Sequence, residues 1–316
     1  MIVIKLSFVI KGALTFVLPR WAFSRSSGGS GSARYCYSVF MRHLVRLNQE
    51  TGFTVPGTVA ELGPGDSLGL GLCALLTGAE RYVGLDVVRF ADLSGNVQVL
   101  DELVSLFQAR TPIPDDQEFP RVRPKLDDYA FPSDILDDAT LARTLGVERI
   151  QALRVKLLGG GGDMITYVAP WYASDQIQAA GVDWIFSQAV LEHVDDLDGA
   201  YRAFAAWLKP EGVMSHQIDF KCHNMAKSWN GHWACSDWLW RVVRGRRPYL
   251  LNREPVTTHQ ALLERHGFDV LSIDRALRDD GHGVAVLPAR FQGLSNEDIA
   301  TAGAFVIVRQ AGAEHA

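Results

Sequence analysis

The stretch Val59–Gly71, VAELGPGDSLGLG, decides the fold of this 316-residue chain. An apolar run with the length of a buried strand comes first, and four glycines then lie within nine residues. The leucine-rich segment that follows has the length of a helix. A strand, a glycine-rich turn and a helix in this order present bare backbone to a ligand at the carboxyl end of the strand.

The residues around the glycines favour a ligand with a positively charged end. The spacing Gly63-x-Gly65-x-x-x-Gly69 differs from the GxGxxG pattern that receives a pyrophosphate at a helix N-terminus. Asp66 follows the second glycine, where it would repel a pyrophosphate, and Glu61 lies just before the loop. S-adenosylmethionine carries an ammonium beside a sulfonium and has no phosphate. The loop therefore predicts this cofactor, with a nicotinamide cofactor as the alternative.

The segments around the loop predict a parallel α/β sheet with helices on both faces. Strand-like runs lie at residues 58–63, 81–87, 164–171, 182–190, 213–220, about 268–276 and 303–310. Helical patterns lie at residues 35–53, 67–78, 96–110, near 174–181, 196–212 and 258–267. Two segments interrupt this alternation and are expected to be insertions. The first covers residues of about 111–163 and is rich in Pro and Asp, and the second covers about 220–258 and is rich in Trp. Residues 1–52 are expected as a helical or lid segment and residues 53–316 as the main domain.

Five stretches occur in the order found in a known family. They are AELGPGDSLG, YVGLDV, VDWIFSQAVLEHVDDL, WLKPEGVMSHQIDF and LLERHGFDVL, within about residues 57–275. On these stretches the chain resembles the class I S-adenosylmethionine-dependent methyltransferases. The resemblance implies a Rossmann-like, doubly wound sheet of seven strands, whose last strand at residues 303–310 runs antiparallel. It also makes residues 53–316 a methyltransferase domain that contains both insertions.

The resemblance further implies a set of cofactor-binding residues. These are Glu61, Gly63, Pro64, Gly65, Asp66, Ser67, Asp86, Ser187 and Gln188. Within this set, Glu61 and the two glycines hold the methionine end, and Asp86, at the end of the second strand, takes the ribose hydroxyls. Ser187 and Gln188 line the side of methyl transfer.

The adenine contact departs from the pattern of the family. Many relatives carry an Asp soon after the third strand to meet the adenine amino group. Here the stretch APWYASD places Trp171 and Tyr172 first. An aromatic edge or Asp175 is therefore the expected contact.

Methyl transfer to a hydroxyl requires a base, and histidine suits that task near neutral pH. The candidate catalytic residues are His193, His216 and His232. We expect O-methylation of a small-molecule or glycan-type acceptor, since aromatic walls stack on rings and sugars. The candidate substrate-binding residues are Trp229, Asn230, Trp233, Asp219 and His223. The alternative is that the tryptophans fill the core of a cap.

A metal-free site is expected, with one alternative. In some related O-methyltransferases the Glu-His pair after the fourth strand helps to bind magnesium, and Glu192 and His193 match that pair. Otherwise His193 caps or packs at a helix start. Two other functions stay open: a nicotinamide-dependent oxidoreductase and a non-catalytic module that only binds a cofactor.

Composition limits the setting and the partners. The net charge of −5 argues against a nucleic-acid partner. Four cysteines without a CxxC pair indicate a reducing cytoplasm. The apolar N-terminus is interrupted by Lys5 and Lys11, so a spanning helix is not expected. It is expected to pack on the domain, with peripheral contact to a membrane surface as the alternative. The oligomeric state is left open.

Overall fold

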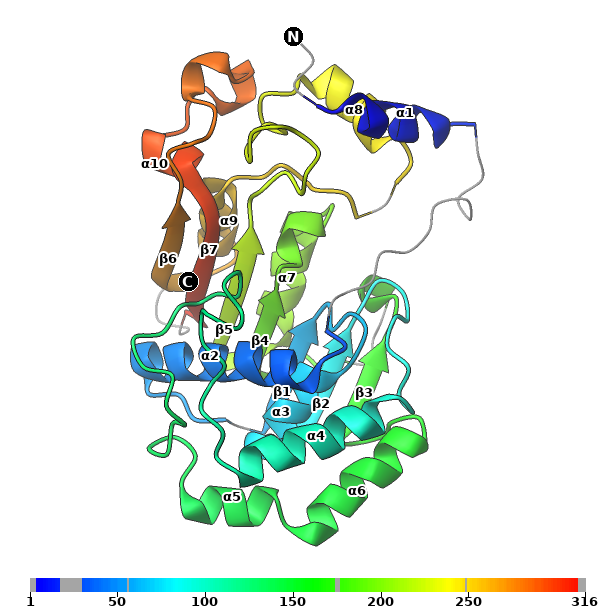
Figure 1. The fold of residues 1–316 in the computed structure, drawn as a ribbon, viewed down its shortest axis with the longest axis vertical. Helices are drawn as coiled ribbons and strands as arrows, with labels where there is room; N and C mark the ends of the chain where they lie inside the picture. The colour runs from blue at the N-terminus through cyan, green and yellow to red at the C-terminus, as the bar shows by residue number, and fades with distance from the viewer. Residues whose placement is uncertain (1–3, 18–29, 56, 174–176, 248, 312–316) are drawn as a thin grey trace.

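The computed structural model describes residues 4–17, 30–55, 57–173, 177–247 and 249–311. In this part of the chain, seven strands form one sheet (Figure 1). They are β1 (Thr58–Leu62), β2 (Arg81–Leu85), β3 (Ile165–Val168), β4 (Val182–Gln188), β5 (Leu208–Asp219), β6 (Phe268–Leu277) and β7 (Thr301–Gln310). Their order is β3-β2-β1-β4-β5-β7-β6, and β7 runs antiparallel to both of its neighbours. The expected Rossmann-like sheet with an antiparallel last strand is confirmed.

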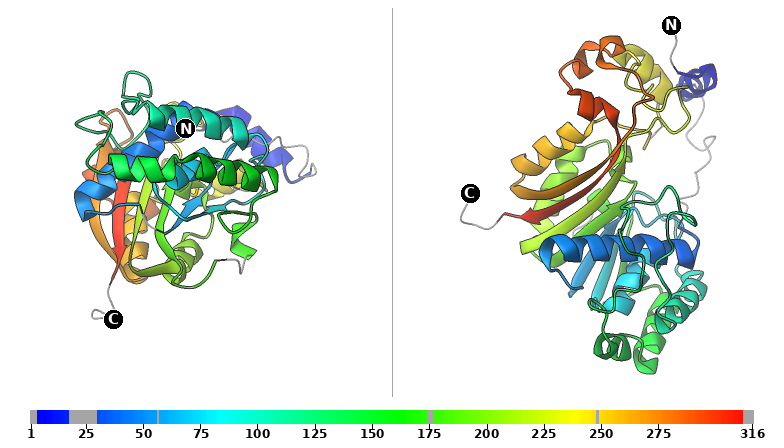
Figure 2. Two further views of the ribbon diagram at one scale, coloured as in Figure 1. Left: turned by 90° about the horizontal axis from the view of Figure 1, so that it is seen from below. Right: turned by 60° about the vertical axis from the view of Figure 1, so that its left-hand side comes forward.

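Helices cover both faces of the sheet (Figures 1 and 2). On one face lie α2 (Ala33–Thr51), α3 (Gly69–Thr77) and α4 (Asn96–Gln108), and on the other lie α7 (Leu197–Trp207) and α9 (Val256–Arg265). Each face has its own apolar core, because the sheet is buried on both sides. The doubly wound arrangement is that predicted from the alternation of strands and helices.

The helix predicted near residues 174–181 is wrong in the part that the structure describes. A single 3₁₀ turn, η2 (Trp171–Ala173), follows β3, and residues 177–181 form turns. Ala180 has a φ of 51°, and the Gly181 N–H donates to the Gln178 carbonyl before β4 begins. The chain therefore enters β4 from a turn, with no helix at residues 177–181. Residues 174–176, which include Asp175, lie outside the described residues.

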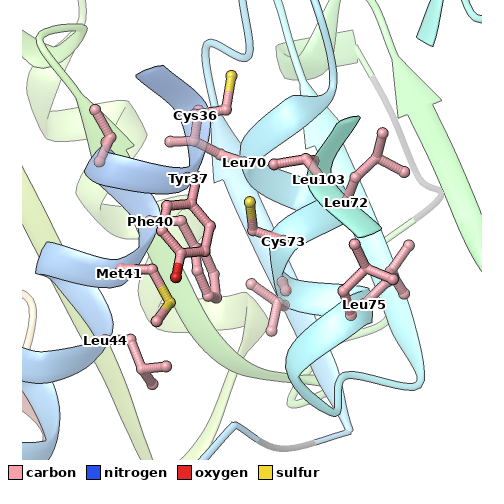
Figure 3. Close-up of a cluster of buried hydrophobic side chains, with 14 of the residues drawn as sticks. Cys36, Tyr37, Phe40, Met41, Leu44, Leu70, Leu72, Cys73, Leu75 and Leu103 are labelled. Atoms are coloured by element: carbon pink, nitrogen blue, oxygen red, sulfur yellow. The ribbon is translucent and has the colours of Figure 1, made fainter. Parts of the chain in front are cut away.

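The four glycines of the opening stretch have two different tasks. Gly63 and Gly65 have φ values of +74° and +76°, which L-residues rarely adopt, and they form the turn between β1 and α3. A Cβ on Gly69 would lie 2.5 Å from the Cys36 sulfur of α2, and one on Gly71 would overlap the Tyr82 ring. Gly69 therefore permits the close packing of α3 on α2, which Figure 3 shows, and Gly71 permits the packing of α3 on β2. These two glycines serve packing, whereas Gly63 and Gly65 serve the turn.

The first insertion covers the α2 face and the far end of the sheet. Its first part is gathered around Arg42 of α2, whose buried guanidinium donates to the carbonyls of Pro114, Val122 and Pro124. Asp116 balances this charge with an ion pair of 2.9 Å. The insertion ends in α5 (Asp138–Thr144) and α6 (Val147–Leu158), which lie at the end of the molecule opposite the strand tips (Figure 1).

The second insertion forms a cap beyond the carboxyl end of β5 (Figure 1). It contains α8 (Asp237–Arg244). The connection between β6 and β7 also belongs to the cap; it covers residues 278–300 and includes α10 (Asn296–Ala300). The Asn230 side chain accepts from the His282 N–H at 2.8 Å and donates to its carbonyl at 3.0 Å. Trp233 packs on Phe291 with ring centroids 6.1 Å apart. The contribution of residues 278–300 to the cap was not predicted.

The N-terminal helix α1 (Leu6–Leu14) packs on α8 of the cap. Gly12 lies so close to α8 that a Cβ there would overlap the Val243 carbonyl. Packing was the favoured expectation, although Leu6, Ile10 and Leu14 remain exposed on the outer side of α1. No helix among the described residues is long and apolar enough to cross a membrane. The four cysteines are buried and unpaired.

Candidate functional site

A cavity of about 580 Å³ opens at the carboxyl ends of β1, β2 and β4. Its size falls in the range of small-molecule and cofactor sites. It lies against the first turns of α7, with Tyr249 of the cap on one side. The residues that line it on the strand side are Leu62, Gly63, Leu85, Asp86, Val87, Trp171, Tyr172, Val190 and His193. The strand tips therefore meet at the ligand edge expected for an open α/β sheet.

Asp86 connects the cavity to the glycine loop. Its carboxylate accepts the Val87 N–H at 2.7 Å, and the backbone N–H of Gly65 lies near it. Burial raises the pKa of Asp86, while these two N–H groups act in the opposite direction. Asp86 thus lies beside the second glycine of the turn and lines the cavity, and its contact with a ribose stays a prediction.

Glu61 is placed differently from the expectation. It is buried, does not line the cavity, and accepts a hydrogen bond of 2.6 Å from the Tyr82 hydroxyl of β2. Burial raises the pKa of Glu61 to about 8, and the nearby Asp86 adds to the shift. Glu61 therefore ties β1 to β2 below the loop. Its direct contact with a cofactor stays a prediction.

The rest of the loop is closed from outside by the segment before α2. The Ser30 hydroxyl donates to the Pro64 carbonyl at 2.6 Å and accepts the Ser67 N–H at 3.1 Å. The Ser67 hydroxyl donates back to the Ser30 carbonyl. Pro64 and Ser67 are buried under this contact, and Asp66 is half-buried between them. None of these three residues lines the cavity.

Ser187 and Gln188, at the end of β4, are engaged away from the cavity. The Ser187 hydroxyl lies 2.8 Å from His216 Nδ1, and Gln188 Oε1 lies 3.0 Å from His43 Nε2. Neither residue lines the cavity, and their predicted place beside the transferred methyl group stays a prediction. Trp171 and Tyr172 do line it, with ring centroids 6.1 Å apart in an edge arrangement. Their contact with an adenine stays a prediction.

Two of the three candidate catalytic histidines are enclosed in the protein. His216 stacks on Phe204 at 5.7 Å between ring centroids, and His232 stacks on Trp233 at 5.2 Å. Their side chains are buried and do not line the cavity. Burial lowers the pKa of each to about 3. The predicted catalytic role of His216 and His232 is therefore not supported by their positions.

His193 is the candidate base that the structure places at the cavity. It belongs to the 3₁₀ turn η3 (Leu191–His193), which follows β4. Its Nδ1 lies 2.9 Å from the Tyr249 carbonyl, so Nδ1 carries the proton and Nε2 keeps a lone pair. Burial, and then the neighbouring His223, lower the pKa of His193 to about 4. The ring is neutral at pH 7.

The predicted substrate-binding residues divide into two groups. Trp229, Asn230 and Trp233 are buried in the core of the cap, as in the alternative interpretation of the tryptophans. Asp219 and His223 lie beside Glu192 and His193 at the tips of β4 and β5. The Asp219 and His223 side chains approach to 3.5 Å, and the His193 and His223 ring centroids are 5.3 Å apart.

Tyr249 is one of several cavity residues that the sequence analysis missed, with Asp195, Asp196 and Arg202 among the others. It lies in the cap shortly after a basic run and has a φ of 59°. A tyrosine in a loop carries no pattern that points to a ligand. Its position depends on the contact between the cap and His193, which the sequence does not display.

His43 of α2 gives the fold a pH dependence. It joins Ser215 Oγ at 2.8 Å and Gln188 Oε1 at 3.0 Å, and burial lowers its pKa from 6.5 to about 4. Between those two pH values the unfolded chain takes up a proton that the folded chain refuses, so the free energy of unfolding falls as the pH falls.

We expect His43→Asn to reduce the slope of unfolding free energy against pH by up to about 1.4 kcal/mol per pH unit between pH 6.5 and 4. The reason is that asparagine does not titrate in this range. Urea unfolding at several pH values measures the slope. An identical slope in both proteins would contradict the assignment.

No protein-family model and no curated protein sequence matches the chain. Among solved structures, it is similar to an S-adenosylmethionine-dependent methyltransferase from Mesorhizobium loti (14% identity, TM-score 0.43), over 84% of this chain and 96% of that one. It is also similar to a putative sarcosine dimethylglycine methyltransferase from Galdieria sulphuraria (12% identity, TM-score 0.45), over 86% of this chain and 85% of that one. A third similar structure is phosphoethanolamine N-methyltransferase 2 from Haemonchus contortus (12% identity, TM-score 0.42), matched over 88% of this chain and 56% of that one. Similarity this low leaves the activity to be inferred from the site itself.

Proposed function

We propose that the protein is an S-adenosylmethionine-dependent methyltransferase. The observation that carries the proposal is the sheet order 3-2-1-4-5-7-6 with an antiparallel β7, combined with a glycine turn and Asp86 at the ligand edge. The dinucleotide-binding fold has the order 3-2-1-4-5-6 and places a pyrophosphate on its glycine loop. The order found here therefore favours the methyltransferase over the nicotinamide-dependent alternative.

The cavity suits a cofactor with a positive charge. Three carboxylates line it, Asp86, Asp195 and Asp196, against one guanidinium, Arg202. Asp195 forms an ion pair with Arg244, and Asp196 caps the N-terminus of α7 by accepting the Gly199 N–H at 2.9 Å. Asp86 would hold the ribose, the turn at Gly63 would admit the methionine end, and Trp171 and Tyr172 would flank the adenine. When bound, S-adenosylmethionine supplies an electrophilic methyl group.

We further propose that the acceptor is a hydroxyl of a small molecule, with glycan-type acceptors included. The support is the neutral His193, whose Nε2 can take the proton of a hydroxyl held in the cavity. Tyr249 keeps the ring in the orientation that exposes this nitrogen. A carbon or nitrogen acceptor would have less need of such a residue.

Two other expectations stay proposals. The exposed Leu6, Ile10 and Leu14 of α1, with Lys5 and Lys11 beside them, favour a peripheral contact with an anionic membrane surface. Co-sedimentation with anionic vesicles tests this contact, and an equal result with neutral vesicles would contradict its charge dependence. The non-catalytic alternative is tested by turnover in a screen of acceptors.

Asp86→Ala is expected to weaken the binding of S-adenosylmethionine by about 1.5–3 kcal/mol, which is about 10–150-fold in Kd. The reason is that the variant loses a charged partner for the ribose. Calorimetric titration measures the change, and thermal melting checks that the variant is folded. Asp92→Ala, a neighbouring exposed carboxylate outside the cavity, is the control. An unchanged Kd for Asp86→Ala would place the ribose elsewhere.

A further inference from the structure

We propose that Glu192, His193 and His223 bind one divalent transition-metal ion at the rim of the cavity. Each of the three offers a ligand atom, and these atoms all lie within 4.8 Å of one another. Two come from η3 after β4, and the third comes from the turn after β5. A bound ion with ligand bonds of about 2.0–2.2 Å would draw them closer by small side-chain movements.

The Glu192 carboxyl group is an independent sign of a missing cation. Its side chain is buried, and neither oxygen has a hydrogen-bond partner. The backbone N–H groups of Glu192 and Asp219 lie near it without forming a hydrogen bond of good geometry. A buried carboxylate is normally paired or bound to a metal. A cation held between Glu192 and the two histidines would satisfy this carboxyl group.

The residues around the cluster hold its ligands in place. The His193 Nδ1–H donates to the Tyr249 carbonyl, which leaves Nε2 as the ligand nitrogen. The Asn252 amide donates to the carbonyls of Leu191 and Val194 at 2.7 and 3.0 Å, and its backbone N–H donates to the Glu192 carbonyl at 2.8 Å. Such outer partners orient the ligands in metal sites. The turn η3 is thus fixed on both sides.

His223 is positioned by the backbone and by Asp219. It has a φ of 44°, and the next residue, Asn224, has a φ of 65°, so the chain turns sharply after β5. Asp219 Oδ2 lies 3.5 Å from His223 Nε2 and 3.1 Å from Lys221 Nζ. We assign Asp219 as the carboxylate that positions His223. Two left-handed residues in a row are unfavourable, and a metal ligand there gives the conformation a function.

The donor set determines the class of ion. Two imidazoles and one carboxylate suit Zn²⁺, Fe²⁺ and similar ions, whereas Mg²⁺ prefers oxygen ligands. Three protein ligands leave a coordination position open, and because His193 lines the cavity, that position would take an acceptor hydroxyl if the ion faces the cavity. A bound ion lowers the pKa of such a hydroxyl. With its Nε2 bound to the ion, His193 would hold the ion in place of taking the proton itself, and the acidified acceptor hydroxyl would lose its proton to solvent. This catalytic part rests on the proposed function, but ion binding does not.

The test is titration of the full-length, chelator-treated protein with Co²⁺, followed by visible absorption. We expect one Co²⁺ per chain, with binding weakened at least about 10-fold in His223→Ala and in Glu192→Gln. His223 is partly exposed, so its removal should leave the fold intact, and thermal melting verifies this. His266→Ala, which removes a histidine paired with Asp198 on another part of the surface, is the matched control and should bind Co²⁺ normally.

The same preparation is titrated with S-adenosylmethionine by calorimetry, which separates the two proposals. Absence of Co²⁺ binding in the wild type, or binding that neither ligand variant weakens, would overturn the metal site while leaving the proposed function standing. Co²⁺ binding without S-adenosylmethionine binding would support the metal site and overturn the proposed function.

Discussion

Replacing His193 by alanine is expected to slow methyl transfer by about 10²–10⁴-fold, the range for loss of a general base. Among the candidate histidines, it is the one that lines the cavity, and its Nε2 is the nitrogen left free by the Tyr249 carbonyl. The affinity for S-adenosylmethionine should stay near that of the wild type, because Asp86 and the glycine turn are unchanged. Single-turnover rates at saturating cofactor measure the effect.

His216→Ala and His232→Ala are the comparison variants for this experiment. Both histidines are buried and stacked on aromatic rings, so their removal should lower stability and leave the rate per folded molecule nearly unchanged. Raising the pH should partly rescue His193→Ala if the acceptor is a hydroxyl that His193 deprotonates directly. Full rate in His193→Ala on a true acceptor would favour an N- or C-acceptor instead.

Replacing Gly63 by valine is expected to abolish detectable binding of S-adenosylmethionine. A Cβ at this position would lie 2.5 Å from Val190 Cγ2, and the φ of +74° is one that a β-branched residue rarely adopts. Both residues line the cavity, so any relief of the overlap must deform the site. Calorimetric titration, with circular dichroism to confirm the fold, measures the loss.

Gly267→Val separates the backbone effect from the effect on the site. Gly267 has a φ of +77°, and a Cβ there would have no neighbour within 4 Å. This variant should lose stability to a similar backbone strain and keep its cofactor affinity. Undiminished binding by a folded Gly63→Val protein would remove the glycine turn from the cofactor site.

The strands of the sheet could be predicted from the sequence because the patterns that indicate a strand are local. Short apolar runs, separated by helical patterns and ended by glycines, indicate strands wherever they lie in the fold. The expected antiparallel β7 came from the family resemblance. The helix predicted near residues 174–181 was wrong because composition does not reveal backbone conformation. Ala180 has a φ of 51°, which an alanine in the sequence does not indicate.

The site was predicted less completely because contacts between distant parts of the chain determine which side chains reach the cavity. Ser187 and Gln188 stand at the tip of β4, yet their side chains are bound by His216 and His43, which come from β5 and α2. Gly69 belongs to the same glycine-rich stretch as Gly63, but it permits the close contact with Cys36 of α2. Proximity along the chain to the glycine loop could not separate these roles.

The acceptor side depended most on long-range packing. The tryptophans predicted to bind substrate fill the cap together with Phe291 from the β6–β7 connection. Tyr249, which does reach the cavity, is held there by its carbonyl contact with His193. By contrast, Asp219 and His223 were proposed separately from Glu192 and His193, and the strand tips of β4 and β5 bring all four together.

The central claim is that the cavity binds S-adenosylmethionine and no dinucleotide. The measurement that tests it most directly is calorimetric titration of the full-length protein with S-adenosylmethionine and, separately, with NAD. We predict saturable binding of S-adenosylmethionine at one site per chain and no measurable binding of NAD, since three carboxylates, Asp86, Asp195 and Asp196, line the cavity and would repel a pyrophosphate. Preferential binding of NAD, or failure to bind S-adenosylmethionine, would contradict the account.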